Sequence, residues 1–175
     1  LKNMNKSVNI LADKIINGEN LGLLGDYDVD GATSSAILFN YLKEISVTTE
    51  VFIPDRIRDG YGISTNSIDF FKQKKTSLII SLDCGSNDTK TIEYAKNSGI
   101  DVIVIDHHEI KNLSNPLSII NPKLSDDNSG LENLCTAGLV FFLIIGLNRE
   151  LRNRKFFEIT KEPNIKEYLD LVAIG

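Results

Sequence analysis

The sequence predicts an α/β fold, with a mainly parallel β-sheet that has helices on both faces. Along the chain, short apolar runs that end in polar or glycine residues alternate with amphipathic stretches of helical period. The runs are apolar throughout, as is typical of parallel strands that helices cover on both sides. A length of 175 residues, 42% of them apolar, fits a single globular domain.

The first half of the chain is predicted to contain three strands and two helices. Leu21–Leu24 is an apolar run and forms the first strand. In residues 33–45, apolar side chains recur three and four positions apart, which indicates a helix. Residues 50–53 form a strand closed by Pro54. The remaining elements of this half are a helix over 66–74 and a strand over 78–82.

The second half continues the alternation. Residues 89–97 form a helix, and Gly99 just beyond it is a typical helix stop. The further expected elements are a strand over 101–105, a weaker strand over 117–120, a largely apolar helix over 134–151 and the start of another helix over 165–174.

Composition excludes several classes of protein. The longest unbroken apolar stretch, Leu139–Ile145, is far shorter than the roughly 18 residues of a membrane span, and no secretory signal opens the chain. Cys84 and Cys135 lack metal-site spacing, which favours reduced thiols and a cytoplasmic location. A net charge of −5 argues against a basic surface that wraps nucleic acid.

Acidic residues and both histidines of the chain follow three of the predicted strands. The carboxyl ends of parallel strands meet at one edge of a sheet, where ligands bind in such folds. Carboxylates packed together repel one another unless cations neutralise them, and a set of oxygen and imidazole ligands without thiols suits Mg²⁺ or Mn²⁺. The residues concerned are Asp26, Asp28, Asp30, Asp83, Asp106, His107 and His108.

Simpler interpretations exist for parts of this set. A single aspartate after a strand is usually a helix N-cap, but capping does not require three acids at alternate positions. The motif at 26–31 resembles the start of a calcium-binding EF-hand loop, yet position twelve is Ile37 instead of glutamate. A haloacid-dehalogenase-like phosphatase, with Asp28 as nucleophile and Asp30 as acid/base, stays open but leaves Asp83 and both histidines without roles.

Asp-His-His at 106–108, together with Gly-Asp-Tyr-Asp-Val-Asp-Gly at 25–31, resembles the DHH phosphoesterase superfamily. Residues 53–62, 81–85, and 121–122 followed by 134–138 are similar, in order and spacing, to the RecJ branch of single-strand-specific 5′→3′ DNA exonucleases. The superfamily's small-nucleotide phosphodiesterases carry a histidine ahead of the paired aspartates, and this chain does not.

The resemblance implies a site for two Mn²⁺ or Mg²⁺ ions. By position in the motifs, Asp28, Asp30, Asp83 and His107 would be metal ligands, with Asp83 a candidate bridge between the ions. Asp26 would be a further ligand or would support one.

The resemblance also implies catalytic and substrate-binding residues. Asp106 would orient a neighbouring histidine, and His108 would contact the scissile phosphate or transfer a proton. Arg56 is a candidate phosphate contact, and Tyr61 and Gly62 would shape the path of the DNA strand.

The implied activity is metal-dependent exonuclease digestion of single-stranded DNA in repair and recombination. Residues 1–175 would be one DHH catalytic domain, cut short before a further aspartate that the family carries after 172–175 and lacking the C-terminal DHH-associated domain. The chain alone is therefore expected to be weakly active or inactive. A phosphodiesterase of short oligonucleotides and a non-catalytic binding domain remain alternatives.

Overall fold

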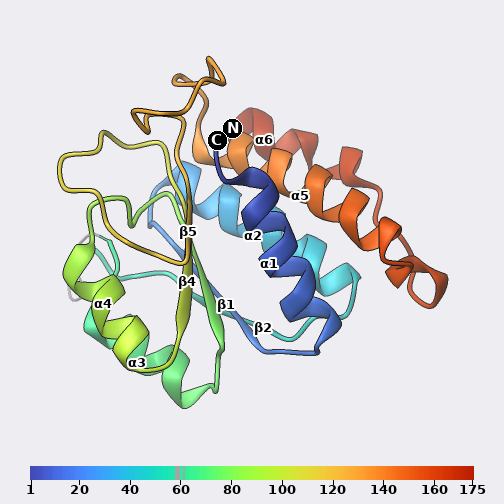
Figure 1. Ribbon diagram of the computed structural model, residues 1–175, viewed down its shortest axis with the longest axis horizontal. Coiled ribbons are helices and arrows are strands. Elements are labelled where there is room, and N and C mark those ends of the chain that lie inside the picture. Colours follow the sequence, from blue (N-terminus) through green and yellow to red (C-terminus); the bar gives the residue numbers. More distant parts are fainter. Residues whose placement is uncertain (58–59, 61) are drawn as a thin grey trace.

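A five-stranded parallel sheet forms the centre of the computed structural model, which describes residues 1–57, 60 and 62–175 (Figure 1). The strand order is β2-β1-β3-β4-β5, and every neighbouring pair runs parallel. This confirms the predicted fold class. The strands are β1 (Leu21–Gly25), β2 (Thr49–Phe52), β3 (Leu78–Leu82), β4 (Asp101–Ile105) and β5 (Ser118–Ile120).

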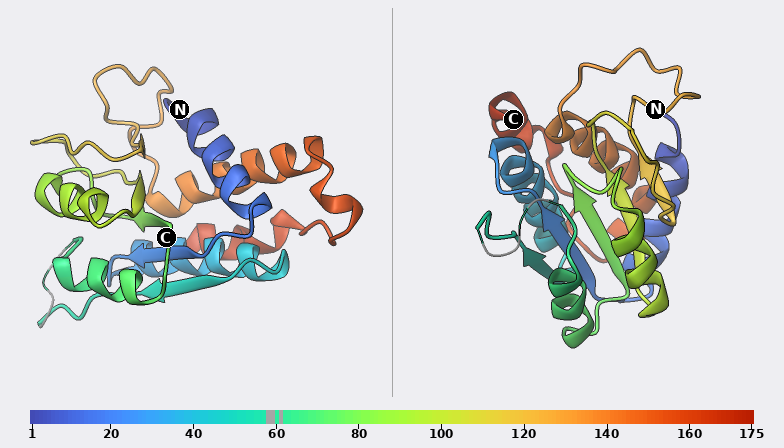
Figure 2. Two further views of the ribbon diagram at one scale, coloured as in Figure 1. Left: turned by 60° about the horizontal axis from the view of Figure 1, so that its bottom comes forward. Right: turned by 90° about the vertical axis from the view of Figure 1, so that its left-hand side faces the viewer.

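Helices cover both faces of the sheet (Figures 1 and 2). The helices are α1 (Met4–Ile16), α2 (Val29–Glu44), α3 (Thr65–Gln73), α4 (Thr89–Asn97), α5 (Thr136–Asn153) and α6 (Leu169–Ile174). One apolar core lies under α1, α2 and α5, and the other lies under α3 and α4. Successive strand residues alternate between the two, so that Leu78 and Ile80 enter the first core and Ile79 the second.

The structure differs from the sequence prediction at three helices. Residues before 21, for which the sequence pattern predicts no helix, form α1, which buries Leu11 and Ile15 on one face. Helix α2 begins at Val29 instead of residue 33, because Asp28 caps it. The stretch 165–174 is split into a 3₁₀ turn over Ile165–Tyr168 and the short α6.

The topology leaves an opening at the carboxyl edge of the sheet. The chain leaves β1 toward α2 on one face and leaves β3 toward α4 on the other. Because these neighbouring connections diverge, the carboxyl ends of β1 and β3 form the switch point where ligands bind in open α/β sheets.

No helix in the described part of the chain is long and apolar enough to cross a membrane.

Candidate metal centre at the carboxyl edge of the sheet

Three of the predicted acids follow β1, two of them in a tight turn and the third in α2. Asp26 is buried, and its Oδ1 accepts a hydrogen bond from the backbone N–H of Tyr27 at 2.8 Å. The Asp28 Oδ1 accepts from the Gly31 N–H at 2.9 Å and so caps α2. A Cβ atom at position 31 would lie only 2.4 Å from the Asp26 carbonyl oxygen, so the turn requires glycine there.

The third acid, Asp30, lies in the first turn of α2 and binds the start of another helix. Its two carboxylate oxygens accept the backbone N–H groups of Thr136 and Ala137, each at 2.8 Å. Asp30 therefore occupies the positive N-terminal end of α5 and joins α5 to the start of α2.

Asp83 follows β3 directly and is almost completely buried, with 1% of its surface exposed. Its backbone has a φ of 64°, a left-handed conformation that is uncommon for a residue with a side chain and typical of functional sites. The Thr136 hydroxyl donates to its Oδ1 at 2.8 Å. The next residue, Cys84, is buried in the core under α3 and α4, so its thiol does not face the site.

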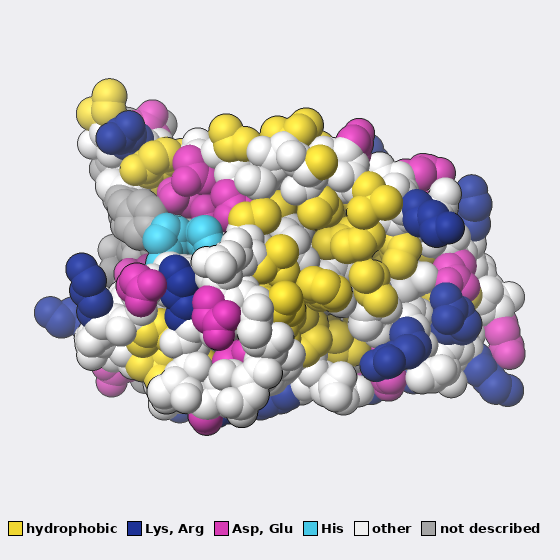
Figure 3. Space-filling view, turned by 90° about the horizontal axis from the view of Figure 1, so that it is seen from above, with side chains coloured by type: hydrophobic (Ala, Val, Ile, Leu, Met, Phe, Trp, Pro, Cys, Tyr) yellow, Lys and Arg dark blue, Asp and Glu magenta, His cyan; other side chains and the backbone are white. Residues whose placement is uncertain are grey.

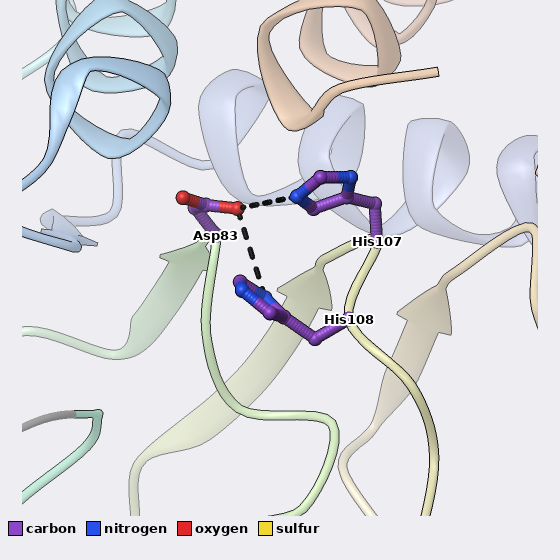
Figure 4. A group of neighbouring side chains, drawn as sticks. All are labelled: Asp83, His107 and His108. Atoms are coloured by element: carbon purple, nitrogen blue, oxygen red, sulfur yellow. Dashed lines mark ion pairs between the residues drawn. The ribbon is translucent and has the colours of Figure 1, made fainter. Parts of the chain in front are cut away.

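The two histidines follow β4 and both face Asp83 (Figure 4). The Asp83 Oδ1 lies 3.5 Å from Nε2 of His107 and 3.8 Å from Nδ1 of His108. The Nε2 atom of His107 also lies 3.6 Å from Oδ2 of Asp30. In the surface view, the histidines lie beside a group of acidic side chains (Figure 3).

Asp106 lies behind the histidines and holds their loop. Its Oδ1 accepts hydrogen bonds from the backbone N–H groups of His107 and His108, and it lies 2.8 Å from Nδ1 of His108. Its Oδ2 accepts from the Ser86 N–H at 3.1 Å. Burial would raise the pKa of Asp106, but the bonds with His108 and Ser86 outweigh it and lower this pKa to about 2.

Protonation at the site follows from these contacts. The hydrogen bond with Asp106 raises the pKa of His108 to about 9. Burial, followed by the nearby charge of Asp30, raises the pKa of Asp83 to about 8, and burial also raises the pKa of Asp26. Carboxyl groups that resist ionisation together in this way are well suited to a site that a cation neutralises.

Two groups of side chains are close enough to hold a metal ion, and they share one residue. Asp26, Asp28 and Asp83 offer oxygen atoms within 4.8 Å of one another, and Asp83, His107 and His108 form a second such group. The donors are oxygen and imidazole nitrogen without thiolate, a set that fits Mn²⁺ or Mg²⁺. These residues therefore fit a divalent-cation site in which Asp83 belongs to both groups of donors.

Arg56 and Gly62, two of the predicted substrate-binding residues, do not belong to these groups. The exposed Arg56 places its guanidinium carbon 5.6 Å from the centre of the Tyr27 ring, beside the loop after β1. Gly62 is buried with a φ of 82°, and the following N–H, of Ile63, donates to Asp88 Oδ2 at 3.1 Å. Tyr61 lies outside the described residues.

Sequence reasoning missed residues that support the site through their hydrogen bonds. Thr136 contacts both Asp30 and Asp83, and the sequence pointed to it only as part of the segment 134–138 that carried the resemblance. Asn121 donates to the Ser86 hydroxyl and to the His108 carbonyl. Asn121 stands in one of the segments that carried the resemblance, and only this position in the sequence indicated that it belongs to the site.

The fold and the site define a class of protein: open parallel α/β domains with aspartates and histidines grouped for divalent cations at the switch point. Residues 20–175 match the model of the DHH family, N-terminal domain, and the chain belongs to this family. The resemblance seen in the sequence is thereby confirmed.

Curated relatives carry the name single-stranded-DNA-specific exonuclease RecJ. The protein from Escherichia coli (strain K12) is 35% identical over 179 residues, which cover all of this chain and 31% of the relative. The protein from Bacillus subtilis (strain 168) is 32% identical, over all of this chain and 21% of the relative. The chain thus spans about a third or less of these relatives.

Solved structures agree with the sequence relatives. The crystal structure of exonuclease RecJ bound to manganese matches with a TM-score of 0.83 and 29% identity, over 99% of this chain and 42% of that one. RecJ from Thermus thermophilus in complex with Mn²⁺ matches with a TM-score of 0.77 and 26% identity, over 99% of this chain and 23% of that one.

Proposed function

We propose that this chain is the metal-binding catalytic part of an exonuclease that hydrolyses single-stranded DNA from the 5′ end with Mn²⁺ or Mg²⁺. The observation that carries the proposal is that two groups of possible metal ligands share the buried carboxylate of Asp83. Support also comes from relatives named as single-strand-specific exonucleases and from RecJ structures named as manganese complexes.

The acids would hold the metal pair. Asp26 and Asp28 would bind on one side of Asp83, with His107 on the other, where its Nε2 faces both Asp83 and Asp30. Divalent ions in such a pair supply an activated water and stabilise negative charge on the phosphoryl group.

His108 would act on the scissile phosphate. Its Nδ1 is held by Asp106, which fixes the ring and favours the protonated imidazole. A protonated imidazole can contact a phosphate oxygen or donate a proton to the leaving 3′-oxygen. Asp106 would act through His108, as an orienting residue.

The DNA strand would approach from the side of β2. Arg56 lies beside the loop after β1 and would bind a phosphate of the DNA, while Gly62 and Tyr61 belong to the segment that would shape the path of the strand. Because the chain has a net charge of −5, its overall field would not attract phosphate. These local contacts and the metal ions would attract the phosphate groups instead.

Among the other functions raised by the sequence, one loses support and another requires an experiment to tell it apart. A haloacid-dehalogenase-like phosphatase loses support because the chain belongs to the DHH family and the histidines face Asp83. A DHH-type phosphodiesterase of short oligonucleotides would use the same site, and it differs from the proposed exonuclease in the length of its substrate.

We include a role in DNA repair and recombination and a cytoplasmic location in the proposal. The free thiols of Cys84 and Cys135 agree with this location.

The test uses the intact gene product that carries this chain, with Mn²⁺ and 5′-phosphorylated single-stranded DNA, duplex DNA or a dinucleotide. We expect loss of nucleotides from the 5′ end of the single strand only. Asp83→Asn should lower the rate by about 100- to 1,000-fold, because metal ions contribute several kcal/mol to such reactions. Asp101→Asn, at the opposite end of the sheet, is the matched control.

Hydrolysis of the dinucleotide alone would identify the small-substrate activity instead. Full activity of the Asp83→Asn protein would contradict the proposed site.

A further inference from the structure

The first residue of α5, Thr136, is completely buried and has two polar donors that both reach acids of the candidate metal centre. Its backbone N–H donates to Asp30 Oδ2, and its hydroxyl donates to Asp83 Oδ1, each at 2.8 Å. One residue therefore joins the loop after β3 to the start of α2, although neither segment is close to it in the sequence.

The Thr136 hydroxyl donates to an Asp83 oxygen that other side chains of the site also face. Oδ1 of Asp83 is also the atom that faces Nε2 of His107 and Nδ1 of His108 (Figure 4). A carboxylate oxygen can accept more than one partner, so a hydrogen bond from Thr136 fixes the rotation of the carboxylate and leaves room for a metal ion.

Helix α5 is a rigid base for this hydrogen bond. Its first two turns bury Leu139, Val140 and Leu143 in the core under α1 and α2. The N-terminal N–H groups of the helix are held by Asp30. The position of the Thr136 hydroxyl is thus set by packing and by hydrogen bonds on both sides.

We propose that Thr136 is a positioning residue of the metal centre, whose hydroxyl orients the carboxylate of Asp83 for the divalent ions that it would bind together with Asp26, Asp28 and His107. The inference rests on the proposed function, because it requires that the centre bind divalent ions.

The test measures the apparent Mn²⁺ dissociation constant by calorimetry, on metal-free intact gene product. Thr136→Val removes the hydroxyl at nearly constant shape, and Thr136→Ser keeps it. We expect Thr136→Val to weaken Mn²⁺ binding by about 10- to 100-fold, as is typical when a group that orients a metal ligand is lost. The Thr136→Ser protein should bind as the unchanged protein does, which a role in packing alone would not produce.

Thr76→Val is the matched control. Thr76 is also a buried threonine, but its hydroxyl has no hydrogen-bond partner among the described residues. Thr76 precedes β3, whereas Asp83 follows the other end of that strand. This variant should bind Mn²⁺ as the unchanged protein does. Melting curves of all variants without metal show which of them are folded.

The outcomes separate the two proposals. If the unchanged protein binds no Mn²⁺, the proposed function fails and this inference fails with it. If the unchanged protein binds Mn²⁺ and Thr136→Val binds equally well, or Thr136→Ser is weakened as much as Thr136→Val, only the inference is wrong. Should Thr136→Val not fold, Thr136→Ala takes its place, and equal binding by Thr136→Ala and Thr136→Ser overturns the inference.

Discussion

Replacing Asp106 by asparagine tests how the histidine loop is held. The carboxylate is buried and accepts three backbone N–H groups, those of Ser86, His107 and His108, and it pairs with the His108 ring. Asparagine has the same shape but turns one acceptor oxygen into an NH₂ donor. If the NH₂ group takes the place of Oδ2, the Ser86 N–H loses its acceptor. If it takes the place of Oδ1, the backbone N–H groups of His107 and His108 and the His108 ring lose theirs.

The cost follows from these contacts. A buried donor left without a partner costs about 1–3 kcal/mol, and replacing the charged partner of His108 by a neutral one removes about 1 kcal/mol more. The free energy of unfolding of Asp106→Asn should therefore fall by about 2–4 kcal/mol. At about 2–4 °C per kcal/mol for a domain of this size, the melting temperature should fall by roughly 4–16 °C.

The assay combines melting curves with an NMR titration of the imidazole protons, both in EDTA. The chain has only two histidines, so their signals can be assigned by replacing one of them. In Asp106→Asn, the pKa of His108 should fall from about 9 toward its ordinary value of 6.5, because its main charged partner is gone. Asp101→Asn should leave it unchanged. A His108 pKa that stays near 9 in Asp106→Asn, with an unchanged melting temperature, would show that Asp106 does not hold this loop.

Three further results are expected. Asp30→Asn should lower the free energy of unfolding by about 1 kcal/mol in urea denaturation, because its carboxylate caps α5, and an unchanged midpoint would count against this contact. The metal-free protein should lose stability as the pH rises from about 6.5 to 9, by several degrees in melting temperature. In the folded protein, His108 has a pKa of about 9 and Asp83 a pKa of about 8, so both keep protons that the unfolded chain releases near pH 6.5 and pH 3.8. A melting temperature that rises between pH 6.5 and 9 would contradict the assigned protonation. A disulfide reagent should modify Cys135 in the folded protein and Cys84 only after unfolding, because burial shields the Cys84 thiol and raises its pKa. Reaction of both thiols without denaturant would contradict the burial of Cys84 in the core under α3 and α4.

The strands and the edge that carries the site could be predicted from the sequence because they depend on local pattern. The apolar run 78–82 is β3 to the residue, and 101–105 is β4. Once the strands are parallel, Asp83 and Asp106 must lie at one edge of the sheet. Helix α2 begins four residues earlier than the apolar pattern predicts, because Asp28 acts as its N-cap, an interpretation that the sequence leaves open beside that of a metal ligand.

The supporting contacts could not be predicted, because they join distant parts of the chain. Thr136 is 106 residues from Asp30 and 53 from Asp83, and only the packing of α5 against α2 brings them together. The left-handed backbone of Asp83 is likewise set by the surrounding structure, since the preference of aspartate for this conformation is weak.

The most direct measurement is anomalous diffraction at the manganese edge from crystals of the protein soaked in Mn²⁺. We expect two peaks on either side of the Asp83 carboxylate, about 3.5–4 Å apart as in other two-metal sites, one beside Asp26 and Asp28 and one beside His107. The absence of a peak within reach of Asp83, with manganese bound elsewhere on the chain, would contradict the metal centre on which the proposed function depends.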